Sequence, residues 1–168
     1  MAATYEPIAT TTASGSSATI TFSSIPSTYT DLVLVVGSVS TTSGAPNITL
    51  TFNSDTGTNY SNTLLEGTGA NATSTRRTSV ANITEGNAIS LGGTNPSTVT
   101  YNIMNYANTS TYKTVLIRTA YPTTTYTGTS AVVGLWRSTA AINAMALNLG
   151  AGNFSSSSVF TLYGIKAA

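Results

Sequence analysis

Apolar and hydroxyl-bearing residues alternate along several short stretches of the chain. One stretch places Ile20 and Phe22 between threonines and serines, and the same pattern returns at residues 48–52 and 99–103. A period of two is typical of a strand that buries one face and exposes the other. No window shows a convincing helical period. The pattern therefore predicts a chain built from strands.

Two other segments, residues 32–36 and 131–136, are apolar at almost every position. The run at residues 32–36 is typical of a strand that is buried on both faces, and residues 131–136 predict a second, densely apolar strand. Further apolar segments at residues 112–120, 145–149 and 159–165 are separated by Gly, Pro, Asn and Ser. Nine or ten strands at this spacing predict an all-β, antiparallel β-sandwich, and a jelly-roll-like topology is our first choice.

The length of 168 residues predicts one domain, which we place at residues 15–168. Residues 1–14 show no period that would bury one face, so we expect an N-terminal arm that lies on a neighbour, or a frayed terminus. Residues 67–86 are polar and unpatterned. This stretch is interpreted as a long surface excursion or a weak edge segment.

Charge is scarce, and this excludes most chemistry. Only 7% of the residues are charged, against about 25% in ordinary globular proteins. His and Cys are absent, which rules out Ser-His-Asp and Cys-His triads and thiolate or imidazole sites for metals. We expect no enzyme, no cofactor and no metal; a hydrolase built on two carboxylates is the one enzyme class left open. Six basic residues with a net charge of +1 also argue against a nucleic-acid partner.

No segment is long enough to cross a membrane. The longest apolar run, residues 32–36, falls far short of the ~20 residues that a spanning helix needs. Residues 1–6 lack the basic and apolar regions of a signal peptide. We therefore expect a protein that is made in the cytoplasm and has no membrane partner.

Four residues are candidate partner contacts. Arg76 and Arg77 form the single basic cluster and could dock a carboxylate of a partner through bidentate pairing. Tyr121 and Tyr126 belong to a Thr-rich segment that we expect to be an exposed loop, where Tyr serves interfaces well. By contrast, Trp136 is expected to pack in the core. Residues 55–59 vaguely resemble a calcium loop but lack its run of acidic ligands, so a turn is favoured.

Several segments together resemble a widespread group of virion proteins from tailed bacteriophages, including phages of cyanobacteria and other aquatic bacteria. The segments cover most of the chain, and the closing LYGIK is the most specific of them. They are residues 20–34 (ITFSSIPSTYTDLVL), 52–61 (FNSDTGTNYS), 134–143 (GLWRSTAAIN), 152–154 (GNF) and 161–166 (TLYGIK). Relatives of this kind are capsid cement or decoration proteins, or modules of tail fibres, and they supply no catalytic residues.

The resemblance implies a structural role in the virion. The favoured hypothesis is a cement protein, homotrimeric by analogy, that lies on the outer capsid surface and clamps adjacent subunits of the major capsid protein. The alternative is a tail-fibre or tail-spike module that recognises host surface polysaccharide. In that case residues 67–87 and 121–129 would supply the contacts to sugar.

Overall fold

The computed structural model describes residues 4–42, 47–85, 90–91, 97–122 and 127–166. Its strands form two sheets, and no helix occurs among the described residues, so none there could span a membrane. Pairing within each sheet is antiparallel, apart from one short parallel contact between β3 and β8. The prediction of an all-β, antiparallel sandwich is confirmed. The jelly-roll detail stays a prediction.

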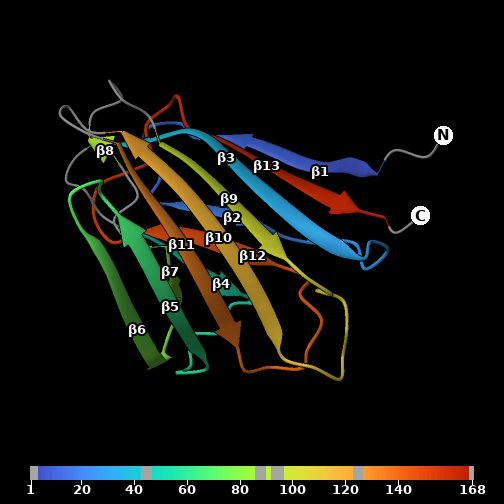
Figure 1. Ribbon diagram of the computed structural model, residues 1–168. Coiled ribbons are helices and arrows are strands. Elements are labelled where there is room, and N and C mark those ends of the chain that lie inside the picture. The colour runs from blue at the N-terminus through green and yellow to red at the C-terminus, as the bar shows by residue number, and fades with distance from the viewer. Residues whose placement is uncertain (1–3, 43–46, 86–89, 92–96, 123–126, 167–168) are drawn as a thin grey trace.

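The large sheet spans the whole molecule (Figure 1). Its two ends, β1 and β6, are edge strands, and β8 (Ser90–Leu91) pairs with the end of β3. In spatial order the sheet contains β1 (Tyr5–Thr12), β13 (Val159–Ile165), β3 (Asp31–Thr41), β9 (Ser97–Ile103), β10 (Lys113–Pro122), β11 (Thr127–Trp136), β5 (Tyr60–Gly67) and β6 (Ala72–Val80).

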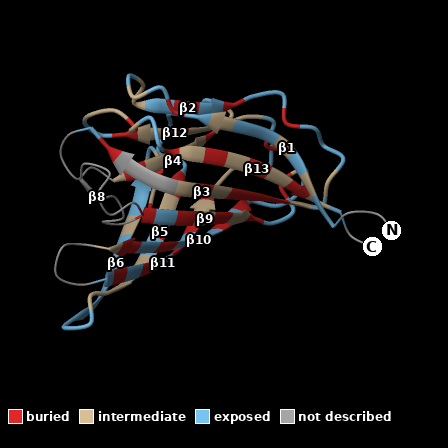
Figure 2. Ribbon diagram, turned by 90° about the horizontal axis from the view of Figure 1, so that it is seen from above, coloured by how far each residue is buried: buried red, intermediate tan, exposed pale blue. Residues whose placement is uncertain are grey.

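The small sheet covers only one face of the large sheet. It contains β2 (Thr19–Phe22), β12 (Met145–Leu149), β4 (Ile48–Phe52) and β7 (Ile83–Thr84), in that order. Figure 2 shows the two layers edge-on, with buried and exposed positions alternating along the strands. The core lies between the layers and includes Leu34, Tyr101 and Val132 from the large sheet and Leu50 and Leu147 from the small one.

An aromatic cluster closes one end of this core. The ring of Trp136 lies 5.5 Å from that of Phe52 and stacks on that of Tyr60 at 6.3 Å. The hydroxyl of Tyr60 accepts a hydrogen bond from the backbone N–H of Phe52 (3.0 Å). Burial raises the pKa of Tyr60 to about 12, so this hydroxyl stays protonated. The expectation that Trp136 packs in the core is confirmed.

The two stretches without a clear pattern are the two edge strands. Within residues 1–14, where an arm or a frayed terminus was expected, β1 pairs with β13 from Tyr5 to Thr12 across a register shift after Pro7. Within residues 67–86, β6 pairs with β5, so the edge-segment interpretation is the one the structure supports. An edge strand packs little apolar surface, so its sequence carries no strong alternation.

Candidate docking surface on the large sheet

Of the four predicted contact residues, Arg76 fits the expectation best. It lies on the edge strand β6 and is exposed. Arg77 faces the other way, toward β7, and its guanidinium donates hydrogen bonds to Thr84 Oγ1 and Asn82 Oδ1. The adjacent arginines therefore serve opposite faces of the sheet, as the strand period of two requires.

Tyr121 does not lie in an exposed loop, and that expectation was wrong. It belongs to β10, is only 6% exposed, and its hydroxyl donates a hydrogen bond to Glu66 Oε1 (2.5 Å). Its ring covers Gly128 of the neighbouring strand, where a Cβ atom would lie 2.1 Å from the ring. The small glycine leaves the space that buries this tyrosine. Tyr126 lies outside the described residues.

The chain's carboxylates are dispersed, and each has a partner within the fold. Glu6 forms an ion pair with Lys166 (2.9 Å), and Glu66 accepts from Tyr121. Asp31 accepts a hydrogen bond from the backbone N–H of Asn105 (2.6 Å). Asp55 and Glu85, described next, complete the five. No group of three or more potential metal ligands occurs in the described part of the chain.

Asp55 organises a turn. One of its oxygens accepts from Trp136 Nε1 (2.7 Å), and the other accepts from the backbone N–H of Gly57 (2.8 Å). The amide of Asn59 donates to the same carboxylate. The hydrogen bond from Trp136, followed by that from Asn59, lowers the pKa of Asp55. With these donors around it, the carboxylate holds the turn, in agreement with the interpretation of residues 55–59.

Glu85 is the one carboxyl group buried between the sheets. Its oxygens accept from the backbone N–H of Ile48 (2.7 Å) and from the hydroxyl of Tyr101 (2.7 Å). Burial raises the pKa of Glu85 to about 8, although both hydrogen bonds oppose that shift. Glu85 therefore joins β4 to β9 within the core.

The surface that stands out is the face of the large sheet turned away from the small sheet, here called the outer face. Leu65, Leu116 and Val133 are exposed there by 57%, 40% and 56%. They lie on β5, β10 and β11, which are neighbours in the sheet. The register places Leu116 beside Val133, and Leu65 beside Ala131. These side chains form one contiguous apolar patch, since neighbouring strands lie ~4.8 Å apart.

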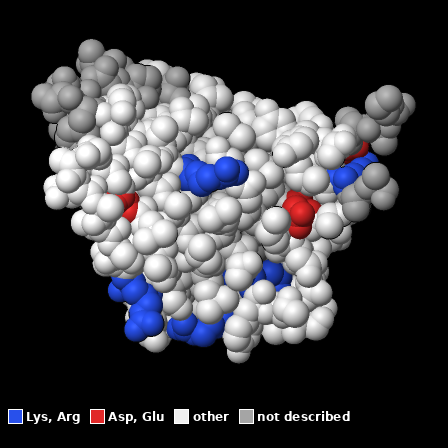
Figure 3. All heavy atoms as spheres, viewed as in Figure 1, with Lys and Arg blue, Asp and Glu red and all other residues white. Residues whose placement is uncertain are grey.

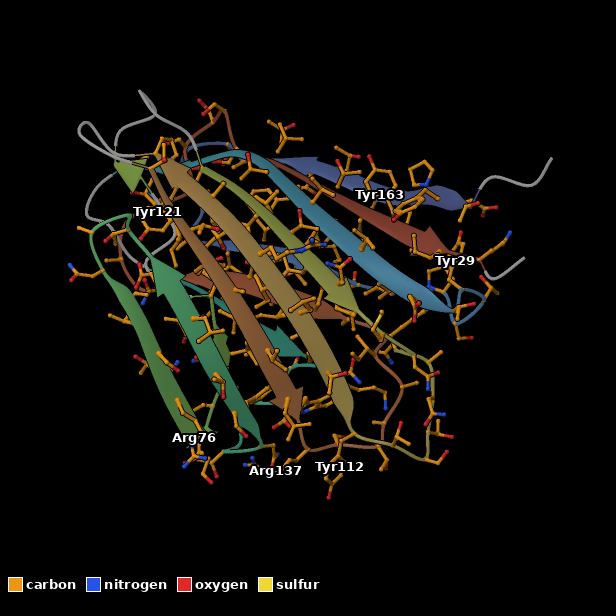
Figure 4. All side chains as sticks on the ribbon, viewed as in Figure 1. Tyr29, Arg76, Tyr112, Tyr121, Arg137 and Tyr163 are labelled. Carbon is orange, nitrogen blue, oxygen red and sulfur yellow. The ribbon has the colours of Figure 1, made fainter. Side chains whose placement is uncertain are left out.

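Three arginines surround this apolar patch. Arg118 follows Leu116 on the same face of β10, and Arg76 lies opposite Thr63, at the β6 end of the row that holds Val133 and Leu116. Arg137 directly follows the end of β11, where it donates to Ser61 Oγ (2.7 Å) and the Thr58 carbonyl (2.6 Å). Figure 3 shows basic side chains in the middle of this face and along its lower border, and Figure 4 labels Arg76 and Arg137 toward that border.

A shallow hollow lies beside Arg118. Its volume is about 440 Å³, and it is open to solvent. It is lined by Thr98, Thr100, Arg118, Thr119, Ala120 and Thr129. The guanidinium of Arg118 makes no hydrogen bond or ion pair with any residue in the described part of the chain. The hollow therefore offers hydroxyl groups and an unpaired cation next to an apolar surface.

This surface was not expected from the sequence. Residues 131–136 were expected to form a dense apolar strand, and within that strand Val133 is mostly exposed. Alternation along residues 115–118 predicts correctly that Leu116 and Arg118 lie on the face opposite Val115 and Ile117. What the pattern could not supply is the pairing of β10 with β11 and of β11 with β5, which assembles the patch.

The chain was compared with models of known protein families, with curated proteins and with solved structures. None of the three comparisons gives a match. Function is therefore inferred from the geometry of the outer face and from the resemblance carried by the sequence segments.

Proposed function

We propose that the chain is a structural protein of a phage virion: a capsid cement protein that clamps adjacent subunits of the major capsid protein on the outer capsid surface. The observation that carries this proposal is the outer face of the large sheet. Leu65, Leu116 and Val133 remain exposed there on a hydrogen-bonded sheet. Contiguous apolar surface of this kind marks interaction sites in soluble proteins.

The rest of the surface suits dense packing in a shell. Thr, Ser and Asn make up 70 of the 168 residues, while charged residues make up 7%. Hydroxyl and amide groups form neutral hydrogen bonds across an interface, and such bonds respond little to pH or salt. Few charges also mean little repulsion between copies placed side by side. The proposal takes the clamping unit to be a homotrimer, which the resemblance to phage virion proteins implies.

Clamping requires only binding. A copy that contacts two neighbouring shell subunits buries apolar surface on both, and separating those subunits would expose it to water again. Each 100 Å² of apolar surface kept from water contributes about 2.5 kcal/mol before the costs of association are subtracted. Because many copies act on one shell, modest contacts add up to resistance against internal pressure.

Heads assembled without the protein test the proposal. We expect their DNA to escape at a lower temperature than from complete heads, as followed by the fluorescence of a DNA-binding dye during heating. Adding back the purified protein should restore the higher temperature. The clamping role is wrong if heads without the protein withstand heating as well as complete ones. Sedimentation equilibrium of the purified protein tests the homotrimer separately.

The second candidate function is a tail-fibre module that binds host polysaccharide. The hollow beside Arg118, lined by threonines, is the observation in its favour, since sugars are bound through hydroxyl groups. One of the loops expected to supply sugar contacts is instead largely the strand β6. Copy number separates the two functions. A cement protein should match the capsid subunits in number, whereas a tail module should be present only in the few copies that a tail carries.

A further inference from the structure

The outer face carries apolar side chains, although an antiparallel sheet usually turns a polar face toward water. Strands that are apolar on both faces are normally buried on both, as in sheets with a layer on each side. In β10 and β11 the inward residues Val115 and Val132 are buried in the core, while the outward Leu116 and Val133 are 40% and 56% exposed, with no layer over them in the described part of the chain. Another molecule is the natural source of the missing layer.

The charges on this face indicate the chemistry of that molecule. Arg76 and Arg118 make no hydrogen bond or ion pair with another described residue, and Arg137 uses only neutral acceptors. Interfaces typically have an apolar centre with Arg among the residues that contribute most to binding. A guanidinium pairs best with a carboxylate, which can accept two parallel hydrogen bonds from it. The complementary surface is therefore apolar in its centre and acidic around it.

A second copy of this chain does not fit that description. All five of its carboxylates have partners within the fold, and Glu85 is buried in the core. Two outer faces placed together would instead bring two arginine-bearing surfaces close to each other, and like charges near each other across an interface cost binding energy. The occupant is therefore a different protein.

The face is also large enough for a stable complex. Eight strands span a width of roughly 34 Å, and seven residues along them span about 23 Å, from the ordinary strand spacing and rise. The resulting area is close to the ~800 Å² that each partner contributes to a typical specific interface. Binding across the whole sheet, including the apolar patch on β10, β11 and β5, would thus give an interface of ordinary size.

We propose that the outer face docks onto an acidic, apolar-centred surface of another protein of the virion shell, and that Arg118 receives a carboxylate side chain of that partner in the hollow beside it. This inference depends on the proposed function, which supplies the shell as the location of the partner. Beyond that function, the inference states which face binds and that this face recognises an acidic, apolar-centred surface. It also states that two copies of the chain do not associate through this face.

The test measures binding of the purified protein to heads that lack it, at increasing concentrations of NaCl. Wild type should bind and weaken as salt rises, because screening reduces the attraction between arginines and carboxylates. The double variant Arg76→Glu/Arg118→Glu should bind about tenfold more weakly or worse, since like charges would then face each other. Arg118→Gln should bind more weakly than wild type and depend less on salt.

Two further variants control for folding and location. Val133→Ser removes apolar contact without adding charge and should also weaken binding. Thr21→Glu places a charge on an exposed position of β2, in the small sheet on the opposite side of the sandwich, and should bind like wild type. Thermal unfolding of every variant confirms that it is folded before its binding is compared.

The outcomes separate the inference from the proposed function. If wild type binds heads and the outer-face variants bind equally well, the inference is overturned while the cement function stands. If wild type does not bind heads at all, both are overturned. If the variants bind heads normally but lose self-association, or lose binding to purified host polysaccharide, the face has a different occupant and the inference is again overturned.

Discussion

A buried carboxyl group is costly in an apolar core, and Glu85 shows how the fold accommodates one. Its two oxygens each receive a hydrogen bond, from Ile48 and from Tyr101, so neither is left without a partner. Burial nevertheless dominates and raises the pKa to about 8 from 4.5. At neutral pH the folded protein therefore binds a proton that the unfolded chain releases.

This proton makes stability depend on pH in a defined direction. A carboxyl group whose pKa is raised in the folded state stabilises the fold fully below about 4.5, and this contribution is lost as pH rises through about 8. We expect the free energy of unfolding in urea to fall between pH 5 and pH 8, by at most about 1.4 kcal/mol per pH unit. The chain has no His to titrate in that range.

The variant Glu85→Gln isolates this group, because it has nearly the same shape and does not titrate. Its free energy of unfolding should be almost constant from pH 5 to pH 8. A slope equal to that of wild type would show that other groups cause the pH dependence.

Asp55 is the second residue with a testable role. Replacing it by Ala leaves Trp136 Nε1 without its acceptor, and a buried donor left unpaired costs about 1–3 kcal/mol. We expect Asp55→Ala to lower the free energy of unfolding by that amount, followed by the fluorescence of Trp136, the only tryptophan. Thr56→Ala, at the exposed neighbouring position, is the matched control and should change stability by less than about 0.5 kcal/mol. Equal effects of the two substitutions would contradict the role given to Asp55.

At the scale of elements, the fit between β10 and β11 depends on one glycine. Tyr121 lies over Gly128 and reaches Glu66 on β5, so three strands are joined on the inner face. Tyr121 and Gly128 are paired directly across the two strands, near the strand ends. This arrangement requires that no Cβ atom occupy position 128.

We expect Gly128→Ala to destabilise the protein by about 1–3 kcal/mol, the usual cost of overpacking, because the tyrosine ring must move away. Tyr121→Ser should also destabilise it, through loss of packing and of the hydrogen bond to Glu66. In the double variant the clash is absent, so its loss of stability should be smaller than the sum of the two single losses. Strictly additive losses in urea unfolding would show that the ring and the glycine do not interact.

The elements also show how far the sequence could predict the structure. Strands with a buried inner face, such as β2, β4 and β9, follow directly from alternation. The edge strand β6 does not, since its residues are held by pairing with β5 and hardly by burial. Tyr121 was taken for a loop residue because its neighbours are threonines, while the glycine that buries it comes from another strand. Pairing between strands is a long-range property that local pattern does not contain.

The same limit applied to the candidate surface. Arg76 could be predicted as a contact residue because it is adjacent to Arg77 in the sequence. Arg118 is a single charge within a largely apolar segment, and nothing in the sequence marked it as a contact residue. Its importance arises only when β10, β11 and β5 come together and place it beside exposed Leu65, Leu116 and Val133.

At the scale of the whole molecule, the outer face combines an apolar centre, which favours association, with arginines, which oppose contact between two identical faces. Salt changes the balance between these effects, because the Debye length falls from about 10 Å at 0.1 M to about 3 Å at 1 M. The apolar attraction does not weaken with screening. We therefore expect the purified protein to keep one assembly state at low salt and to form larger assemblies in 1 M NaCl, as measured by sedimentation velocity.

Variants that remove either effect should shift this behaviour in opposite directions. Arg76→Gln/Arg118→Gln lacks the repulsion, so it should form larger assemblies already at 0.1 M NaCl. Adding Val133→Ser to that variant removes part of the attraction and should return it toward the low-salt state of wild type. If 1 M NaCl leaves wild type unchanged and the double variant behaves like it at 0.1 M, then arginine repulsion is not what keeps these faces apart.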